Sequence, residues 1–280
     1  MDVVRPEFVP DPSLSTAEME ALQREIADVA VFTDDFAFDT AAVSLDGPAG
    51  QTTLGERPGQ GATDSEAPLV AGVDQAFVDD RAVSAIVVLR GREIVERTYA
   101  VEPAAIPYVP GLLSFREGGA ILAAFETLAC EPDIVFVDGS GRIHYREAGL
   151  ATHVGVTLDV PAIGVAKNLL CGRPSESLDR KLPEGARVAI EADAEVETSG
   201  ASETRRAGGD AGDGTVIGYA VQSRQYDSSS QYINPLIVSP GHRVSAETAA
   251  DLVLATAAGY KLPEPTRLAD SYADSVKGEL

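Results

Sequence analysis

Three runs rich in β-forming residues follow one another closely between residues 69 and 101, and they constrain the fold more than any other feature of the chain. The runs are Leu69–Phe77, Val83–Arg90 and Ile94–Val101, and the turns between them are as short as Asp79-Asp80 and Arg90-Gly91-Arg92. Connections of this length join antiparallel neighbours. The segment therefore predicts a three-stranded antiparallel meander.

The pattern of elements changes after residue 101. Apolar residues at helical spacing predict a helix from about 115 to 130, and a second helix is expected near 146–158. The short apolar runs Ile134–Val137 and Ala162–Ala166 are typical of strands buried on both faces. A meander followed by alternating helices and strands is the order of an RNase H-like sheet. We therefore expect an α/β fold with an RNase H-like mixed sheet flanked by helices.

Further elements are expected on either side of this core. Ser15 and Glu18 form a capping-box pattern before an apolar helical stripe, which predicts a helix over 15–31. Ser245 stands at the cap position of an amphipathic helix expected over 245–260. Additional strands are predicted at Arg187–Glu191, Val216–Gln222 and Pro235–Pro240.

Composition divides the chain into three parts. Residues 1–68 form an acidic N-terminal helix and linker, in which the segment 46–67 is rich in Gly, Pro, Thr and acidic residues. Residues 69–270 form the main domain, with an acidic, Gly-rich insert at about 192–214. Residues 271–280 form a C-terminal tail.

The strong negative charge of the chain bears on its ligands. The net charge is −22, which argues against a nucleic-acid ligand because phosphate binding rests on Lys and Arg. Residues 1–68 carry 14 acidic and 3 basic side chains and residues 191–214 carry 7 and 2, so most of the excess lies outside the motifs described below. Abundant Asp and Glu with few Lys indicate adaptation to a cytoplasm with concentrated salt.

Other whole-chain features favour a cytoplasmic protein. The sequence has no apolar run of 18 residues, so we expect no membrane span. Its N-terminus lacks the basic and apolar regions of a signal peptide. Cys130 and Cys171 lie in apolar surroundings and are expected to be reduced thiols. We expect a monomer.

Two aspartates are expected at neighbouring strand ends. Asp74 follows the apolar run Val70–Val73. Asp138 follows the apolar run Ile134–Val137, which is expected to be a buried strand. Asp138 alone fits an Asx turn equally well. Placed side by side, the two carboxylates would repel each other unless they were protonated or bridged by a cation. Hard oxygen ligands suit Mg²⁺, with Mn²⁺ as a substitute.

Glu117 and Tyr108 each allow two interpretations. Ser114-x-x-Glu117 matches a capping box, in which the carboxylate would only reach back to a backbone N–H; alternatively, Glu117 points toward the metal. Pro107 and Pro110 stiffen the loop that carries Tyr108. That ring could pack on the core, or it could project as a wedge that enters a base stack.

Three further polar residues are candidates for function. His242 follows a predicted strand and is expected near the catalytic edge of the sheet, whereas His144 follows the Asp138 turn. Lys167 comes directly after the strand Ala162–Ala166 and could stabilise charge on a phosphate or simply be solvated.

These motifs together resemble the endonuclease V (deoxyinosine 3′-endonuclease) family. The resemblance rests on Pro-Tyr-Val-Pro-Gly-Leu-Leu-Ser-Phe-Arg-Glu at 107–117, Val-Asp-Gly-Ser-Gly at 137–141 and Ile-Gly-Val-Ala-Lys at 163–167, in one order. It implies that 69–270 is the catalytic domain. It also implies that Asp74, Asp138 and Glu117 bind Mg²⁺, that Lys167 and His242 join them in catalysis, and that Tyr108, Gly111, Leu113, Gly139 and His144 contact DNA.

The resemblance further implies an activity. The family hydrolyses the second phosphodiester bond 3′ to deoxyinosine, leaving 3′-hydroxyl and 5′-phosphate ends. This chain departs from the family at Ser140, where the family often has His. Alternatives are a nuclease for inosine-containing RNA, a non-catalytic module that binds inosine or branched nucleic acid, and a different RNase H-like nuclease such as a junction resolvase.

Overall fold

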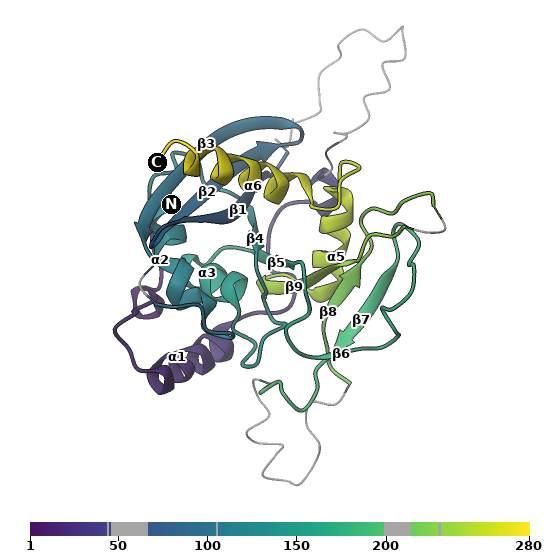
Figure 1. The fold of residues 1–280 in the computed structure, drawn as a ribbon, viewed down its shortest axis with the longest axis horizontal. Helices are drawn as coiled ribbons and strands as arrows, with labels where there is room; N and C mark the ends of the chain where they lie inside the picture. Colours follow the sequence, from purple (N-terminus) through teal and green to yellow (C-terminus); the bar gives the residue numbers. More distant parts are fainter. Residues whose placement is uncertain (44, 46–66, 105, 199–213, 229–230) are drawn as a thin grey trace, which may run out of the picture.

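A mixed β-sheet runs through the centre of the protein (Figure 1). The computed structural model describes residues 1–43, 45, 67–104, 106–198, 214–228 and 231–280. Within them, nine strands form one sheet in the order β3-β2-β1-β4-β5-β9-β8-β7-β6. The strands are β1 (Leu69–Val78), β2 (Arg81–Arg90), β3 (Glu93–Pro103), β4 (Ile134–Asp138), β5 (Ala162–Ala166), β6 (Arg173–Pro174), β7 (Arg187–Glu191), β8 (Val216–Val221) and β9 (Leu236–His242).

The first three strands form the predicted antiparallel meander. Their two turns contain Asp79 with a φ of 51° and Gly91 with a φ of 58°, the left-handed conformation that tight two-residue hairpins require. β1 then pairs in parallel with β4, and β4 pairs in parallel with β5. The carboxyl ends of β1, β4 and β5 therefore point to the same edge of the sheet.

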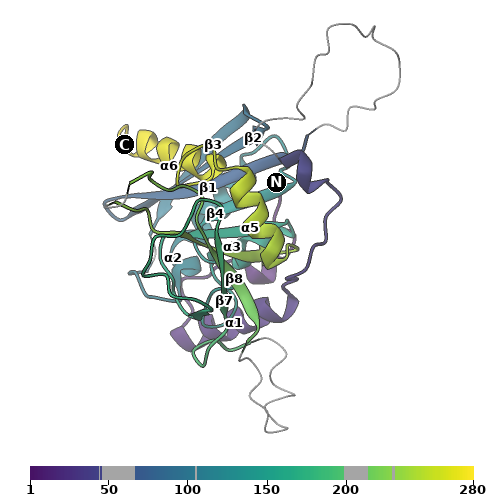
Figure 2. The ribbon, with the colours of Figure 1, turned by 90° about the vertical axis from the view of Figure 1, so that its right-hand side faces the viewer.

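Helices cover both faces of the sheet (Figure 2). The buried face of α2 (Leu113–Glu126) and α3 (Leu150–Leu158) packs on one side, and α1 (Thr16–Val29) lies outside α3. On the opposite side, α5 (Ala246–Ala255) packs over β8 and β9 and α6 (Glu264–Lys277) packs over β1 and β2. Short 3₁₀ turns at Pro6–Phe8 and Thr40–Val43 complete the elements.

Helix caps follow the predictions made from Ser15 and Ser245. Ser15 and Glu18 form both hydrogen bonds of a capping box at the start of α1. The Ser245 side chain accepts a hydrogen bond from the backbone N–H of Thr248, although α5 ends at Ala255 rather than near residue 260.

The linker predicted at 46–67 falls almost entirely outside the described residues, as does most of the insert predicted at 192–214.

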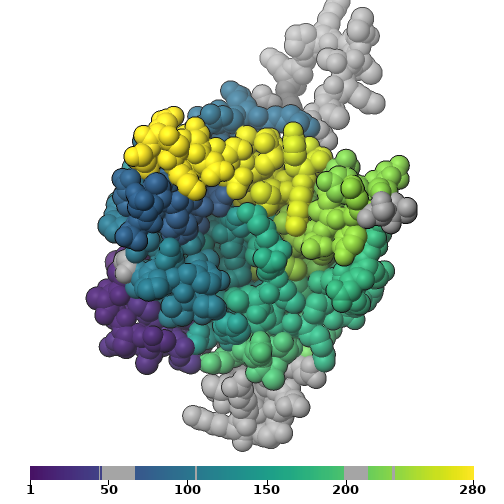
Figure 3. Space-filling view, viewed as in Figure 1, coloured from purple at the N-terminus to yellow at the C-terminus, as the bar shows by residue number. Residues whose placement is uncertain are grey.

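The C-terminal helix α6 was not predicted. It spans Glu264–Lys277, so the boundary expected at residue 270 lies inside a continuous helix. In the space-filling view the yellow C-terminal helix lies directly beside the blue strands of the meander (Figure 3).

None of the helices in the described part of the chain is long and apolar enough to cross a membrane.

Candidate active site

Asp74 and Asp138 are neighbours on adjacent parallel strands. Val73 of β1 and Val137 of β4 are register partners, so the next residue on each strand is an aspartate at the same level. Burial, the charge of Asp138 and a hydrogen bond with Asp270 raise the pKa of Asp74 well above its usual range. The pair therefore favours a bound proton or a bound cation.

Asp270 of α6 joins this pair because α6 approaches β1 unusually closely. A Cβ at Gly72 would lie 2.0 Å from the carbonyl oxygen of Pro265, so a side chain at Gly72 would push the helix away. Asp74 lies two residues beyond Gly72 along β1, a rise of about 6.6 Å, and Asp270 lies five residues beyond Pro265 along α6, a rise of about 7.5 Å. Asp74 and Asp270 are thus brought level, and their side chains hydrogen-bond.

Glu117 faces the aspartates from α2 and does not cap its helix. The N-cap of α2 is Leu112, and no side-chain cap hydrogen bond is formed there among the described residues. Glu117 is 7% exposed. Burial raises the pKa of Glu117 to about 7, with Arg116 lowering it and Asp138 raising it. The capping-box interpretation of Ser114 and Glu117 is therefore wrong.

Lys167 stands on the other side of Asp138. It directly follows β5, whose Val165 is the register partner of Asp138. Its Nζ lies 3.1 Å from Asp138 Oδ2. About half of the Lys167 side chain is exposed, so the ammonium group borders both the acidic cluster and solvent.

His242 does not lie with these residues. It pairs with Ala162 at the start of β5, whereas Lys167 and Asp138 lie at the opposite end of the paired strands. His242 is buried, its Nδ1 accepts from the N–H of Val31, and its Nε2 lies 3.1 Å from Asp159 Oδ1. The expectation that His242 lies at the catalytic edge is wrong, because β9 runs antiparallel to β5.

A cavity of about 380 Å³ opens beside Asp138 and Lys167. Its wall comes from the Tyr108 loop, the start of α2, the Asp138 turn, the start of α3 and the segment after β5. All five residues expected to contact nucleic acid lie in this wall, namely Tyr108, Gly111, Leu113, Gly139 and His144. Ser140 lies there too.

The Tyr108 loop is held at the rim of this cavity. Tyr108 is 66% exposed, so its ring projects and does not pack on the core. Gly111 has a φ of +80°, which a residue with a side chain rarely adopts, and a Cβ there would lie 3.0 Å from Tyr145. His144 is buried below the loop, with Nε2 3.0 Å from the carbonyl oxygen of Gly111.

The hydroxyl of Ser114 lies in the cavity wall without a hydrogen-bond partner among the described residues. Ser114 is 2% exposed, and its Oγ forms no hydrogen bond within the part of the chain that the structure describes. Burying a hydroxyl without a partner costs free energy, so such groups are rare in folded proteins. The Ser114 hydroxyl is therefore an unsatisfied buried group beside the cavity.

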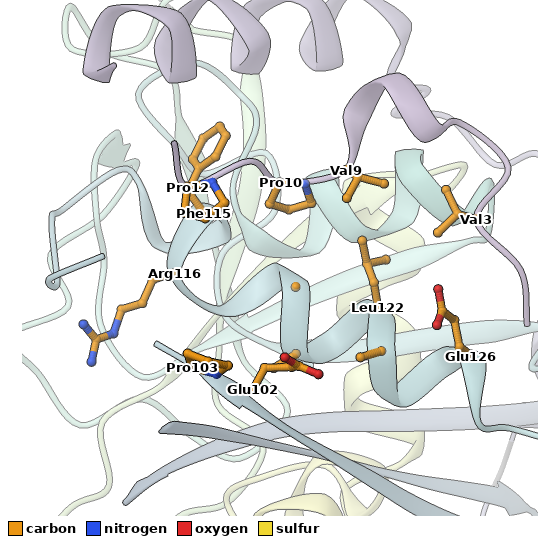
Figure 4. Close-up of a pocket in the computed structure, with 13 residues that line it drawn as sticks. Val3, Val9, Pro10, Pro12, Glu102, Pro103, Phe115, Arg116, Leu122 and Glu126 are labelled. Carbon is orange, nitrogen blue, oxygen red and sulfur yellow. The ribbon is translucent and has the colours of Figure 1, made fainter. Parts of the chain in front are cut away.

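A second cavity, of about 390 Å³, lies against the outer side of α2 (Figure 4). Its wall is mainly apolar, from the N-terminal segment and α2, and Glu102 and Glu126 stand at its edge. The Arg116 guanidinium points away, donating to the carbonyl of Ile106 and stacking on Phe77. None of the acidic cluster lines this cavity.

The acidic cluster has the donor chemistry of a magnesium site. Among the described residues, no three or more His, Cys, Asp or Glu side chains are arranged as a ready metal-binding group. Mg²⁺ commonly binds through one or two carboxylates while keeping several waters and contacting substrate phosphates. Asp74 and Asp138 fit that requirement, since their oxygens are adjacent and burial disfavours a second unbalanced charge.

Comparison with known proteins identifies the family. The family model for endonuclease V matches residues 59–271. The chain belongs to the endonuclease V family. The endonuclease V of Haloarcula marismortui, a halophilic archaeon, is 65% identical over 280 residues, covering 99% of this chain and 98% of its own.

Solved endonuclease V structures share the fold. That of Streptomyces avermitilis has a TM-score of 0.68 and 31% identity, covering 100% of this chain and 99% of its own. That of Ciona intestinalis, in complex with a DNA containing an inosine followed by a ribo-adenosine, has a TM-score of 0.62 and 25% identity, covering 94% and 97%. These comparisons confirm two predictions, that the fold is RNase H-like and that the protein is a nuclease of this family.

Sequence analysis missed Asp270. The available signal was the helical spacing of Pro265, Ala269, Ala273 and Val276, which form the buried stripe of α6. Asp270 lies next to that stripe, where partial burial is expected, and the structure shows it half-buried beside Asp74.

Proposed function

We propose that this protein is a Mg²⁺-dependent endonuclease that recognises deoxyinosine and hydrolyses the second phosphodiester bond 3′ to it, with Mn²⁺ as a substitute metal. Such an activity would initiate repair of deaminated adenine in DNA. The observation that carries the proposal is one cavity whose wall includes both the projecting Tyr108 loop and the Asp138–Lys167 pair. Base recognition and phosphate chemistry therefore share one site.

The cavity fits a base removed from its stack. Its wall combines the loop and turn backbone with apolar side chains such as Leu113 and Leu150, and it lies below the exposed ring of Tyr108. An enzyme that acts at a particular base commonly extrudes that base into a pocket, which costs a few kcal/mol of stacking. Tyr108 can offset part of that cost by occupying the gap in the duplex. The inosine-containing DNA bound by the Ciona relative supports this assignment.

The acidic cluster would hold the metal. Asp74 and Asp138 are the principal ligands, with Glu117 and Asp270 facing them from the two covering helices. A bound Mg²⁺ supplies Lewis-acid stabilisation of phosphoryl charge and lowers the pKa of a coordinated water. Lys167 neutralises part of the charge of Asp138 and borders solvent, where it can contact a phosphate oxygen.

Cleavage of a 5′-labelled duplex carrying one deoxyinosine tests the proposal. The reaction contains Mg²⁺ and KCl from low to multimolar concentration. We expect one cut, one nucleotide 3′ of the inosine. Asp138→Asn should lower the rate by roughly 10²-fold or more while duplex binding persists. Asp28→Asn, which removes the same charge from an exposed position on α1, is the matched control and should cleave normally.

The outcomes separate the alternatives. Wild-type turnover by Asp138→Asn would remove Asp138 from the mechanism. Cleavage of inosine-containing RNA but not DNA would reassign the substrate, and equal cutting of branched DNA without inosine would indicate a resolvase. Folded protein that binds inosine but cuts neither nucleic acid at any salt concentration would be a binding module. Full folding and activity at low salt, with no gain from KCl, would refute salt adaptation.

A further inference from the structure

Gln23 is a buried amide in a helix whose other buried residues are apolar. It lies in α1 and is 1% exposed, alongside Met19, Ile26 and Ala27. Burying an amide without hydrogen bonds is unfavourable, so a buried amide is expected to be paired. Both ends of the Gln23 amide are paired. Its Nε2 donates to the carbonyl oxygen of Gly111 at 2.8 Å, and its Oε1 accepts from Nη1 of Arg146 at 3.1 Å.

The carbonyl of Gly111 receives two donors from separate parts of the chain. Besides Gln23, Nε2 of His144 lies 3.0 Å from the same oxygen. The N–H of Arg146 donates to Nδ1 of His144, which leaves the proton of a neutral ring on Nε2 as the donor. Both acceptor positions of this carbonyl are thus used inside the protein.

The donor groups are themselves held in place. Arg146 forms an ion pair with Glu20 at 2.5 Å, one helical turn before Gln23. The Arg146 side chain is 12% exposed and the Glu20 side chain 32%, so this pair is partly shielded from solvent. Helix α1 therefore fixes Gly111 directly through Gln23 and indirectly through Arg146 and His144.

We infer that Gln23 is a positioning residue that holds the rim of the base cavity in its binding conformation. The inference rests on the proposed function. Gly111 ends the stiff Tyr108 loop and lines the cavity, so fixing its peptide plane fixes the wall against which a base would lie. A loop already held in place loses less conformational freedom when it binds a ligand. α1 also lies outside residues 59–271, where the family model matches, and this contact gives it a function.

Gln23→Leu and Gln23→Glu test the inference. Leu keeps the volume and removes both hydrogen bonds, whereas Glu keeps an acceptor for Arg146 and loses the donor to Gly111. Gln225→Leu is the matched control, because Gln225 is also buried and donates to a backbone carbonyl, that of Leu182 at 3.0 Å, away from the cavity. Circular dichroism establishes that each variant folds.

The first readout is the kcat/KM for duplexes with deoxyinosine or deoxyadenosine at one position. We expect both Gln23 variants to lose preference for inosine by about three- to tenfold, mainly through KM, as for one lost hydrogen bond. Gln225→Leu should keep the preference even if its Tm falls. Equal losses on the two duplexes, or a loss shared by Gln225→Leu in proportion to Tm, would overturn the inference.

The second readout needs no substrate and separates this inference from the proposed function. Amide hydrogen exchange over residues 106–113 should accelerate by about three- to tenfold in the Gln23 variants and stay unchanged in Gln225→Leu. Unchanged exchange in the Gln23 variants would refute the positioning role. Faster exchange in a protein whose wild type cuts no inosine duplex would refute the proposed function and leave the positioning role standing.

Discussion

Asp74 and Asp138 are adjacent because Val73 and Val137 are register partners of two parallel strands. Parallel strands β1 and β4 end at the same edge of the sheet, so residues after paired positions emerge together. This relationship places two carboxyl groups in a partly buried site, where burial and the charge of Asp138 raise the pKa of Asp74. We therefore expect the site to lower the stability of the fold in the absence of a cation.

Asp74→Asn should stabilise the protein when divalent metals are chelated. The amide replaces a buried carboxylate without the repulsion from Asp138, so we expect the free energy of unfolding to rise by about 1–2 kcal/mol at pH 8. Added Mg²⁺ should raise the Tm of the wild type but not of the variant.

Thermal unfolding with chelator and with Mg²⁺ measures both effects. Asp133→Asn is the control. Asp133 accepts a 2.7 Å hydrogen bond from the N–H of Leu69, and a neutral amide oxygen is a weaker acceptor than the carboxylate, so this substitution should not raise the Tm. A less stable Asp74→Asn in chelator would contradict the repulsion argument.

Asp270→Asn should reduce cleavage by roughly tenfold or more, because Asp270 contacts Asp74 from α6. Asp274→Asn is the control. It lies one helical turn further along α6 on the exposed side, and it should retain full activity. Single-turnover rates at saturating Mg²⁺ make the comparison. Equal rates for the two variants would place Asp270 outside the reaction.

The meander and the acidic pair could be predicted because their determinants are local. Two-residue turns fix the pairing of β1, β2 and β3, and a short apolar strand followed by Asp138 fixes where that carboxylate emerges. The flanking prolines likewise predict a stiff loop at Tyr108, but the structure is needed to show that its ring projects and does not pack on the core.

His242 and Asp270 depend on information that the local sequence does not contain. A residue at the end of a strand lies at one edge or the other according to the strand's direction, and β9 is antiparallel to β5. Asp270 meets Asp74 only through the packing of α6 against Gly72. Likewise, Gln23 resembles a surface residue until the position of Gly111 is known.

Tyr108→Ala should weaken the preference for inosine more than the dependence on Mg²⁺. Base–aromatic stacking contributes about 1–3 kcal/mol, so we expect roughly a tenfold loss in the ratio of kcat/KM for inosine and normal duplexes. Tyr108→Phe should retain most of the preference, because the proposed wedge is the aromatic ring. Tyr232→Ala, which removes another exposed ring, is the control. An unchanged ratio in Tyr108→Ala would exclude the wedge.

His153 should make the fold less stable as the pH falls below neutrality. It is 1% exposed, its Nε2 lies 2.7 Å from the carbonyl oxygen of Phe8, and burial lowers its pKa to about 4. In the unfolded chain the pKa of this histidine is near 6.5. Between about pH 6.5 and pH 4, a proton therefore binds His153 in the unfolded state more readily than in the folded state. Stability is fully present above that range, and about 2 kcal/mol should be lost between pH 7 and 5.

Denaturant unfolding of the wild type and His153→Gln at pH 7 and 5 isolates this effect. Glutamine can still donate to the carbonyl of Phe8 but does not titrate. The difference in free energy of unfolding, wild type minus His153→Gln, should therefore fall by about 2 kcal/mol between pH 7 and pH 5. Glu117 acts in the opposite direction, because its raised pKa favours the fold as the pH falls toward 4.5, and it cancels in the comparison. An advantage independent of pH would show that His153 is protonated to the same extent in the folded and unfolded states.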